Sequence, residues 1–287
     1  MRTRADALAS PLTRGRRLGA IVDLRLGRRV SPARLAAEVS KRAAVCAALG
    51  LGPGGRAALV RGNGWELLAD LLAVWEAGAC AIVLDPGLPP PALEAALLRG
   101  GAGYVLTDRP RPAGAAPSPV WLDPGSETAR LPGLLPRARL DDPALILYTS
   151  GSSGEPKGVV HSHRTLGARL AALRAEIGPR RLRRTLCVLP SSFGHGLIAN
   201  CLLPLLSGGE LSLLPASSAS ALADLGGLLD ETRATFLSSV PAIWRVALSL
   251  SRPPRRGSLE RVHCASAPLS AQLWRDARAW TGGADLR

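Results

Sequence analysis

Lysine and aromatic residues are scarce in this sequence. Only Lys41 and Lys157 are lysines, so arginine supplies nearly all of the 36 basic side chains, against 22 acidic ones. Phenylalanine, tryptophan and tyrosine together make up 3% of the chain. Proteins that bind nucleic acids usually interleave basic with aromatic side chains or carry a recognisable binding fold. Neither feature is found, so the net charge of +14 is interpreted as a solvated arginine surface. We expect no specific nucleic-acid partner, only non-specific attraction to polyanions.

Cysteine pairs with metal-ligand spacing are absent. The five cysteines form no CxxC pair, and their number is odd: Cys46, Cys80, Cys187, Cys201 and Cys264. A disulfide framework usually needs an even number of cysteines, and a zinc cluster needs closely spaced ones. The sequence therefore predicts free thiols and a reduced, cytoplasmic compartment.

Long hydrophobic runs are also missing. The longest apolar stretch, residues 67–84, is interrupted by Asp70 and Glu76. A membrane-spanning helix needs about 20 mainly apolar residues. A secretory signal needs an apolar segment that residues 1–17 lack. We expect neither a membrane span nor a secretory signal.

The sequence does contain a regular alternation of apolar strands and amphipathic helices. Ser31 is suited to cap the first helix and Pro32 suits its first turn. Helices are expected at residues 31–49, 64–79, 89–101, 164–178, 195–208, 220–233, 242–250 and 270–282. Strands are expected at residues 56–63, 80–86, 103–108, 144–150, 183–190, 210–215, 234–241 and 259–269. This pattern predicts an α/β fold of layered, mainly parallel sheets with helices. Residues 109–143, rich in Pro, Gly and Arg, are expected to form a loop-dominated connection.

Residues 148–163, with the sequence YTSGSSGEPKGVVHSH, form the most informative segment. The segment follows an apolar strand and precedes a helix, which places it at the carboxyl end of a parallel strand, where α/β sheets bind ligands. Its glycines allow close approach of the backbone, and its hydroxyls and lysine are donors suited to a polyphosphate. The candidate phosphate-binding residues are Thr149, Ser150, Gly151, Ser152, Ser153, Gly154 and Lys157.

Two other functional loops are excluded for this segment. A Walker A loop requires G-x-x-x-x-G-K-[ST], whereas Pro156 precedes Lys157 and Gly158 follows it. The G-x-S-x-G elbow of hydrolases requires a glycine where Glu155 stands. An ordinary Gly/Ser turn is the structural alternative, and the number of consecutive fitting positions favours the phosphate loop.

The segment LILYTSGSSGEPKGVVHSHRTL resembles the phosphate-loop signature of the adenylate-forming, or AMP-binding, enzymes. That family includes acyl- and aryl-CoA synthetases, the adenylation domains of nonribosomal peptide synthetases, and luciferases. Four further segments resemble family segments in the family's order: residues 74–108, 189–215, 234–248 and 259–270. The resemblance extends over about residues 30–287, which is most of the chain.

The resemblance implies a two-step activity. Family members join a carboxylic acid to ATP, releasing pyrophosphate, and then pass the acyl group to a thiol of coenzyme A or of a carrier protein's phosphopantetheine. Mg²⁺ would arrive with ATP, so the chain itself is expected to carry no metal site. The loop would hold the β- and γ-phosphates. The acyl pocket would be lined by Phe193, His195, Ser266, Ala267 and Pro268.

The residue at position 195 indicates which class of carboxylic acid the chain is expected to bind. Peptide-synthetase adenylation domains place an aspartate near this position to hold the substrate amine. The sequence FGHG offers no carboxylate, so it disfavours an α-amino acid and is closer to the acyl- and aryl-CoA ligases, where a histidine or aromatic gates the pocket. A histidine at a helix start that makes a local hydrogen bond is the alternative. His161 and His163 are not interpreted as a metal site, because a third ligand is lacking.

Several family motifs are not found in the sequence. The resemblance implies a threonine–glutamate motif, a ribose-binding aspartate, a hinge arginine and a small C-terminal lid with the adenylation lysine, all beyond the matching segments. Residues 1–287 are therefore interpreted as a partial AMP-binding N-terminal domain without its lid, resembling an acyl-CoA synthetase. The alternatives are a fragment of a peptide-synthetase adenylation domain and a non-catalytic remnant that binds nucleotide or a partner. The expected partners are a small carboxylic acid and either a carrier protein or a downstream polypeptide.

Overall fold

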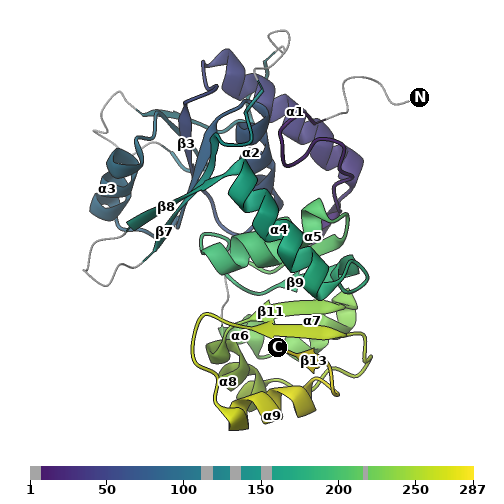
Figure 1. Cartoon of the computed structure of the whole chain (residues 1–287). Coiled ribbons are helices and arrows are strands. Elements are labelled where there is room, and N and C mark those ends of the chain that lie inside the picture. The colour runs from purple at the N-terminus through teal and green to yellow at the C-terminus, as the bar shows by residue number, and fades with distance from the viewer. Residues whose placement is uncertain (1–7, 111–118, 130–136, 150–156, 216–218) are drawn as a thin grey trace. The chain divides into compact units, whose positions relative to one another are not determined.

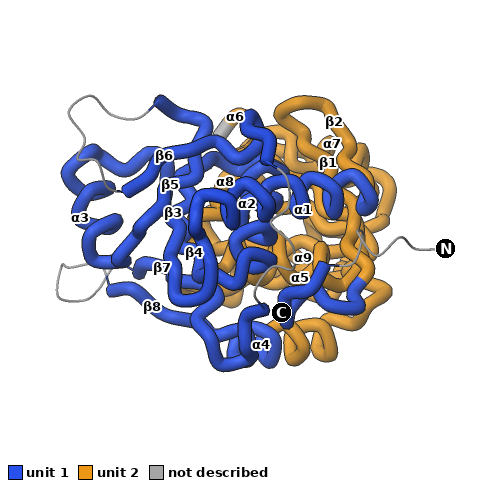
Figure 2. The backbone as a smooth tube through the Cα atoms, turned by 90° about the horizontal axis from the view of Figure 1, so that it is seen from above, with its two compact units in different colours: residues 1–16, 32–169 blue, residues 17–31, 170–287 orange. Residues whose placement is uncertain are grey.

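The computed structural model describes residues 8–110, 119–129, 137–149, 157–215 and 219–287. It contains two parallel-rich sheets covered by helices (Figure 1), as the strand–helix alternation predicted. The backbone divides into two compact units (Figure 2). Unit 1 comprises residues 1–16 and 32–169, and unit 2 comprises residues 17–31 and 170–287. In the part of the chain that the structure describes, no helix is long and apolar enough to cross a membrane.

A six-stranded sheet forms the centre of unit 1. Its strand order is β6 (Val120–Leu122), β5 (Tyr104–Leu106), β3 (Arg56–Val60), β4 (Cys80–Leu84), β7 (Pro143–Thr149) and β8 (Lys157–Ser162). All neighbours are parallel except β7 and β8, which are antiparallel. The sequence of β4, CAIVL, is apolar and buried throughout because a central parallel strand is covered on both faces. The carboxyl ends of the parallel strands therefore lie at one edge of this sheet.

Helices cover both faces of the unit 1 sheet (Figure 1). On one face, α3 (Pro90–Gly100) packs with Val60, Ile82 and other side chains of the strands. On the opposite face lies α2 (Trp65–Glu76), backed by α1 (Pro32–Ala48), and all residues of α2 except Glu66 are buried. The last helix to begin in this unit is α4 (His163–Ile177). Successive side chains of a strand point to opposite faces, so two helical layers can be filled at once.

A buried ion network explains the charge inside the apolar stretch of residues 67–84. Asp70 lies in α2 and is completely buried. Arg42 of α1 donates to its Oδ1, and Nε of Arg61 donates to its Oδ2 at 2.5 Å. Arg61 also donates to Asp123, which follows β6. The network links α1, α2 and the ends of β3 and β6, and each charge has a partner of opposite sign, as buried charges require.

A seven-stranded sheet forms the centre of unit 2. Its strand order is β13 (Asp285–Leu286), β12 (Arg261–Cys264), β11 (Phe236–Ser239), β9 (Arg184–Cys187), β10 (Glu210–Leu213), β1 (Ile21–Asp23) and β2 (Arg28–Val30). All neighbours are parallel except β1 and β2. The segments after β9, β11 and β12 therefore emerge at the same edge.

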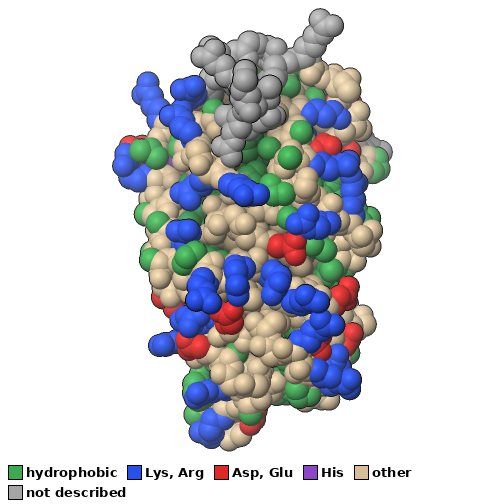
Figure 3. Space-filling model, turned by 90° about the vertical axis from the view of Figure 1, so that its right-hand side faces the viewer, with side chains coloured by type: hydrophobic (Ala, Val, Ile, Leu, Met, Phe, Trp, Pro, Cys, Tyr) green, Lys and Arg blue, Asp and Glu red, His purple; other side chains and the backbone are tan. Residues whose placement is uncertain are grey.

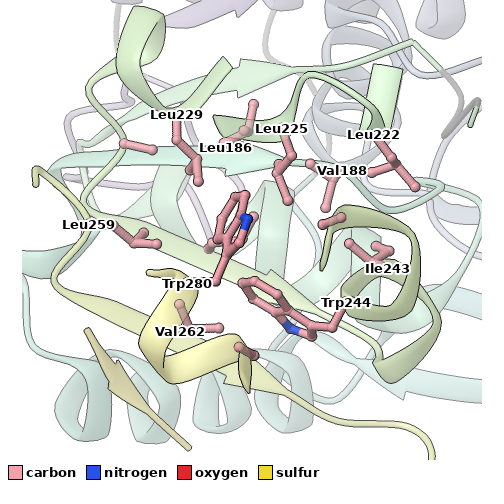
Figure 4. Close-up of a cluster of buried hydrophobic side chains, with 14 of the residues drawn as sticks. Leu186, Val188, Leu222, Leu225, Leu229, Ile243, Trp244, Leu259, Val262 and Trp280 are labelled. Atoms are coloured by element: carbon pink, nitrogen blue, oxygen red, sulfur yellow. The ribbon is translucent and has the colours of Figure 1, made fainter. Parts of the chain in front are cut away.

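Helices of unit 2 build a leucine- and tryptophan-rich core against the sheet. The helical segments are η2 (Arg181–Arg183), η3 (His195–Leu202), α5 (Leu203–Leu206), α6 (Ala219–Leu222), α7 (Leu225–Thr232), α8 (Pro241–Leu250) and α9 (Ala271–Trp280). Trp244 of α8 and Trp280 of α9 meet edge to face, with ring centroids 5.7 Å apart (Figure 4). Their indole N–H groups donate to Ser239 Oγ and to the carbonyl of Ser251. Each polar edge is thus satisfied inside an apolar cluster.

Within the described residues the structure adds five short strands and one helical turn to the expected elements, and it divides one expected helix. The hairpin of β1 and β2, the strand β6 within residues 109–143, the strand β8, the C-terminal β13 and the turn η2 were not expected. The helix expected at residues 220–233 is two helices, α6 and α7. Gly226 in α7 lies against the carbonyl of Arg252, which an added Cβ atom would approach to 2.0 Å, so α7 requires glycine at this position.

Candidate functional site

The candidate phosphate loop lies between two strands of unit 1. β7 ends at Thr149, β8 begins at Lys157, and these two residues face each other across the antiparallel pair. Both are exposed, and Thr149 Oγ1 donates to the carbonyl oxygen of Lys157 at 3.4 Å. The other candidates, Ser150, Gly151, Ser152, Ser153 and Gly154, fall outside the described residues.

The strand β8 separates the loop from the helix α4, which differs from the prediction made from the sequence. We expected the loop to lead from a strand directly into a helix, but β8 intervenes and α4 begins only at His163. The other part of the expectation is confirmed, because β7 is parallel to β4 and its carboxyl end leads into the loop. Residues 157–162 give a weak strand signal because apolar and polar residues do not alternate in the sequence KGVVHS.

Contacts of β7 and β8 fix the two ends of the loop. The hydroxyl of Tyr148 donates to the carbonyl of Ala96 in α3 at 2.9 Å. Gly158 lies beside the side chains of Ile146 and Tyr148. A Cβ atom added to Gly158 would be in van der Waals contact with both of them. Because both strands join the sheet through these contacts, Thr149 and Lys157 are held at its carboxyl edge.

The side chain of His163 packs in the interior of unit 1. It is buried at the start of α4, and its ring meets Trp75 edge to face at 6.0 Å between centroids. Neither ring nitrogen has a hydrogen-bond partner within the described residues, and burial lowers the pKa of this imidazole. Among the described residues there is no group of three or more His, Cys, Asp or Glu side chains that could hold a metal ion.

The candidate acyl-binding residues lie in unit 2, on two segments that follow parallel strands. Phe193 and His195 come after β9, and Ser266, Ala267 and Pro268 come after β12. Phe193 is 47% exposed, and the three residues after β12 are exposed as well. β9 and β12 lie on either side of β11. The sequence-predicted pocket residues thus share one edge of the unit 2 sheet.

His195 is held by two hydroxyl groups. Its Nδ1 is 3.0 Å from Ser266 Oγ, and its Nε2 is 2.6 Å from Ser238 Oγ in β11. These partners are 71 and 43 residues away in the sequence. The ring therefore joins three segments of the sheet edge and is not limited to a local contact. Ser238 is 1% exposed and was not expected in the site.

The helix that carries His195 is wider than an α-helix. η3 is of the π type, and the amide of Leu203 donates to the carbonyl of Ile198, five residues earlier. Asn200 is completely buried and its Nδ2 donates to the carbonyl of His195 at 3.3 Å. Gly196 lies so close to the Pro190 carbonyl that an added Cβ would be 2.1 Å from its oxygen. Segments of π-helix are rare and frequently occur at functional sites.

Comparison with known proteins shows the family. A sequence model described as "AMP-binding enzyme" matches residues 13–286. This chain belongs to that family, as the segments around the phosphate loop indicated. The matched region includes most of both units and every candidate residue named above.

Relatives of this family member fall in two groups. It is 31% identical over 253 residues to a feruloyl-CoA synthase from an Amycolatopsis species, with 83% of this chain and 50% of the relative covered. It is 29% identical over 210 residues to tyrocidine synthase 3 from Brevibacillus parabrevis, with 72% of this chain and 3% of the relative covered. The chain thus spans about half the length of the first relative and a small part of the second.

Solved structures agree with this assignment. The nonribosomal peptide synthetase FmoA3, in a form bound to α-methyl-L-serine-AMP, is 26% identical with a TM-score of 0.80, and the match covers 94% of this chain and 31% of that one. An ATP-bound chimera, RpMatB-BxBclM, is 27% identical with a TM-score of 0.80, covering 99% of this chain and 59% of the chimera. The fold of an adenylate-forming N-terminal domain is therefore shown for this chain.

Proposed function

We propose that residues 1–287 form a partial adenylating domain that activates a carboxylic acid with ATP and releases pyrophosphate. The acyl-adenylate then passes its acyl group to a thiol of coenzyme A or of a carrier protein. The observation that carries this proposal is the pair of exposed residues Thr149 and Lys157 at the carboxyl end of β7, in a chain that belongs to the AMP-binding enzymes. A C-terminal lid would be supplied by further polypeptide.

The residues of unit 1 fit the charge of ATP. Lys157 is an exposed ammonium at the start of β8, and Thr149 offers a hydroxyl beside it. Together with the hydroxyls and amides proposed for residues 150–154, they would hold the β- and γ-phosphates. The reaction develops charge on these phosphates, so positioned donors are the main contribution that the protein makes. Mg²⁺ would enter with ATP.

The residues of unit 2 favour an acid without an α-amino group. His195 contacts the hydroxyls of Ser238 and Ser266, and these partners carry no negative charge that would hold an ammonium group. Phe193 adds an exposed ring to the same sheet edge. An aliphatic or aromatic acid is therefore proposed as the substrate. The similarity to peptide synthetases supports amino acids as the second class to test.

Calorimetric titration with ATP and Mg²⁺ tests the nucleotide site. Lys157→Ala removes one charge-assisted contact, which is expected to weaken ATP binding by roughly 1.5–3 kcal/mol, or about 10- to 100-fold. The control is the double variant Arg255→Ala/Arg256→Ala, which removes two exposed charges from unit 2. The control should bind ATP as the wild type does. Equal losses in both variants would mean that the binding reflects overall charge, and the proposed site would be wrong.

A further inference from the structure

A serine–histidine–serine arrangement lies at the carboxyl edge of the unit 2 sheet. Ser266 Oγ is 3.0 Å from Nδ1 of His195, and Ser238 Oγ is 2.6 Å from Nε2 of the same ring. With the proton on Nε2, the ring donates to Ser238, and Nδ1 accepts the hydroxyl proton of Ser266. Sites of acyl transfer contain a nucleophile, a base hydrogen-bonded to it and a third group that orients the base, and Ser266, His195 and Ser238 have this arrangement.

The backbone of Ser266 is unusual for a residue with a side chain. Its φ is 70°, in the left-handed region that favours glycine. The turn is fixed on one side by the amide of Ala265, which donates to the carbonyl of Ser239 at 3.1 Å. Nucleophilic serines of hydrolases also occupy a sharp, strained turn directly after a strand. Ser266 is exposed whereas Ser238 is buried, so Ser266 is the hydroxyl that a substrate can reach.

The residue after Ser266 supplies a second element of such a site. Ala267 is exposed, and its amide makes no hydrogen bond within the described part of the chain. In hydrolases with a serine elbow, the amide of the residue after the nucleophile donates to the oxyanion that forms during attack. The turn therefore combines a hydroxyl, a base in contact with it and an adjacent amide donor.

We infer that Ser266 is an acyl-accepting nucleophile, with His195 as its general base and Ser238 as the positioning residue for the imidazole. The substrates are activated acyl compounds with a good leaving group: aryl esters, which release a phenolate, and mixed anhydrides such as an acyl-adenylate, which release AMP. This activity goes beyond the proposed adenylation and requires neither ATP nor the phosphate loop.

The reaction balances with water as the only co-substrate. Ser266 Oγ forms a bond to the acyl carbon while its proton moves to His195 Nδ1, and the bond from that carbon to the leaving group breaks. The leaving group takes up the proton. Water then attacks the acyl-serine, again giving its proton to Nδ1, and the bond to Oγ breaks as Ser266 is protonated. The net change is activated acyl compound plus water to carboxylic acid plus the protonated leaving group.

The two leaving groups predict how the rate divides between the two steps. Acylation expels a good leaving group, whereas deacylation must expel the alkoxide of Ser266, which is a far poorer one. Attack on an activated ester needs little help from the base, whereas hydrolysis of the serine ester needs more. We therefore expect a fast burst of one product per chain, followed by slow turnover.

The test uses the 287-residue chain and p-nitrophenyl acetate. Stopped-flow absorbance should show a burst of p-nitrophenolate close to one equivalent. Mass spectrometry of the quenched protein should place the acetyl group on the peptide that contains Ser266. A fluorophosphonate probe should label the same residue. ATP binding is measured separately, so failure of the adenylation proposal and failure of this one are distinguishable.

Three variants and one control assign the roles. Ser266→Gly should abolish burst and label, and it cannot act by strain because glycine suits a φ of 70°. His195→Asn should slow the burst at least 10-fold. Ser238→Ala should still be labelled at Ser266. The pH at which its burst rate is half-maximal should shift, and a merely structural role of Ser238 would not cause such a shift. Ser249→Ala, an exposed serine of α8, should match the wild type.

Two results would overturn the inference. One is a burst and label that persist in Ser266→Gly, because the acyl group would then rest on another residue. The other is a wild-type chain with neither burst nor label at millimolar ester. A folded wild type and a folded Ser266→Gly variant, checked by circular dichroism, make both results decisive.

Discussion

Arg233 has a backbone conformation that its side chain does not favour. It follows α7 with φ 48° and ψ 42°, and its amide donates to the carbonyl of Leu229. A left-handed residue at this position closes many helices and is usually glycine. Arg233→Gly is expected to raise the free energy of unfolding by about 0.5–1 kcal/mol, because the strain of a Cβ atom is removed. Urea unfolding monitored by tryptophan fluorescence measures the change.

A matched control separates this strain from the loss of an arginine. Arg245 is exposed within α8, where the backbone is helical. Arg245→Gly should lower the free energy of unfolding by about 1 kcal/mol, because glycine is a poor helix former. The two Arg→Gly substitutions are thus expected to change the free energy of unfolding in opposite directions. The same sign for both would contradict the role of φ at residue 233.

His163 should make the stability depend on pH. Burial lowers the pKa of its imidazole in the folded protein below the usual value of about 6.5. As the pH falls below about 6.5, the unfolded state takes up a proton that the folded state does not. The free energy of unfolding should therefore be highest above pH 6.5 and decrease at lower pH, by at most about 1.4 kcal/mol per pH unit for this one group.

The measurement is urea unfolding between pH 5 and 8. His163→Leu keeps an apolar contact with Trp75 and removes the titration, so its stability should change less over this range than that of the wild type. His161 and His263, whose pKa values burial also lowers, remain in both proteins and supply a common background. An identical pH profile in wild type and variant would show that His163 does not titrate in this range.

At the scale of elements, Gly196 fixes the start of η3. An added Cβ would lie 2.1 Å from the carbonyl oxygen of Pro190, which is backbone and cannot rotate away. Gly196→Ala is expected to lower the free energy of unfolding by about 1–3 kcal/mol. It should also displace His195 from Ser238. Chemical denaturation gives the stability, and the histidine ring resonances in NMR spectra report the displacement.

Gly62→Ala is the control for this change. Gly62 lies just after β3, no heavy atom lies within 4 Å of an added Cβ, and its φ is not positive. An alanine there should leave the stability within about 0.5 kcal/mol or raise it slightly. A loss at residue 62 as large as that at residue 196 would show that glycine removal in general, not the contact with Pro190, is responsible.

The elements that the sequence predicted are those with a strong local pattern. α1 and α2 have helical spacing of apolar residues, and β4 is a continuous apolar run, so each was found close to its observed bounds. β1, β2 and β13 have only two or three residues each. β1 is held by β10 and β13 by β12, which lie far from them in the sequence, and β2 is a strand only through its hairpin with β1. No local period can indicate a strand of this kind.

The candidate site shows the same limit. His195 and Ser266 were named from the family segments that contain them. Ser238 was missed because it meets His195 only through the placement of β11 between β9 and β12. The parallel order of those three strands would have been the necessary signal, since residues at one sheet edge come together whatever their separation in sequence.

At the scale of the whole molecule, the arginine-rich composition is found mainly at the surface. Figure 3 shows Lys and Arg side chains spread over the face in view, with fewer Asp and Glu between them. This agrees with the interpretation of the +14 charge as a solvated surface. It also means that any anionic ligand is attracted non-specifically, and that this attraction is screened by salt. Binding of ATP should therefore be measured near physiological ionic strength.

The extent of the chain gives the last prediction. The match covers about half of the feruloyl-CoA synthase, and the glutamate, ribose-binding aspartate and lid lysine implied by the family resemblance were not found in the sequence. Loss of one preorganised electrostatic group typically slows an enzyme by about 10²–10³-fold. We expect the 287 residues alone to catalyse carboxylate-dependent exchange between ATP and pyrophosphate far more slowly than a full-length family enzyme.

The assay should include aliphatic, aromatic and amino acids, each with the chain alone and with a polypeptide that corresponds to the remaining half of the relatives. Exchange restored by that polypeptide would support a domain completed by a second segment. The same mixture with Lys157→Ala is the control, and at ATP concentrations below saturation its exchange should be at least about 10-fold slower, because the phosphates then lose a charged contact. Exchange by residues 1–287 alone at the rate of a full-length enzyme would contradict the prediction, because the groups that the family resemblance implies beyond the matching segments would then be dispensable.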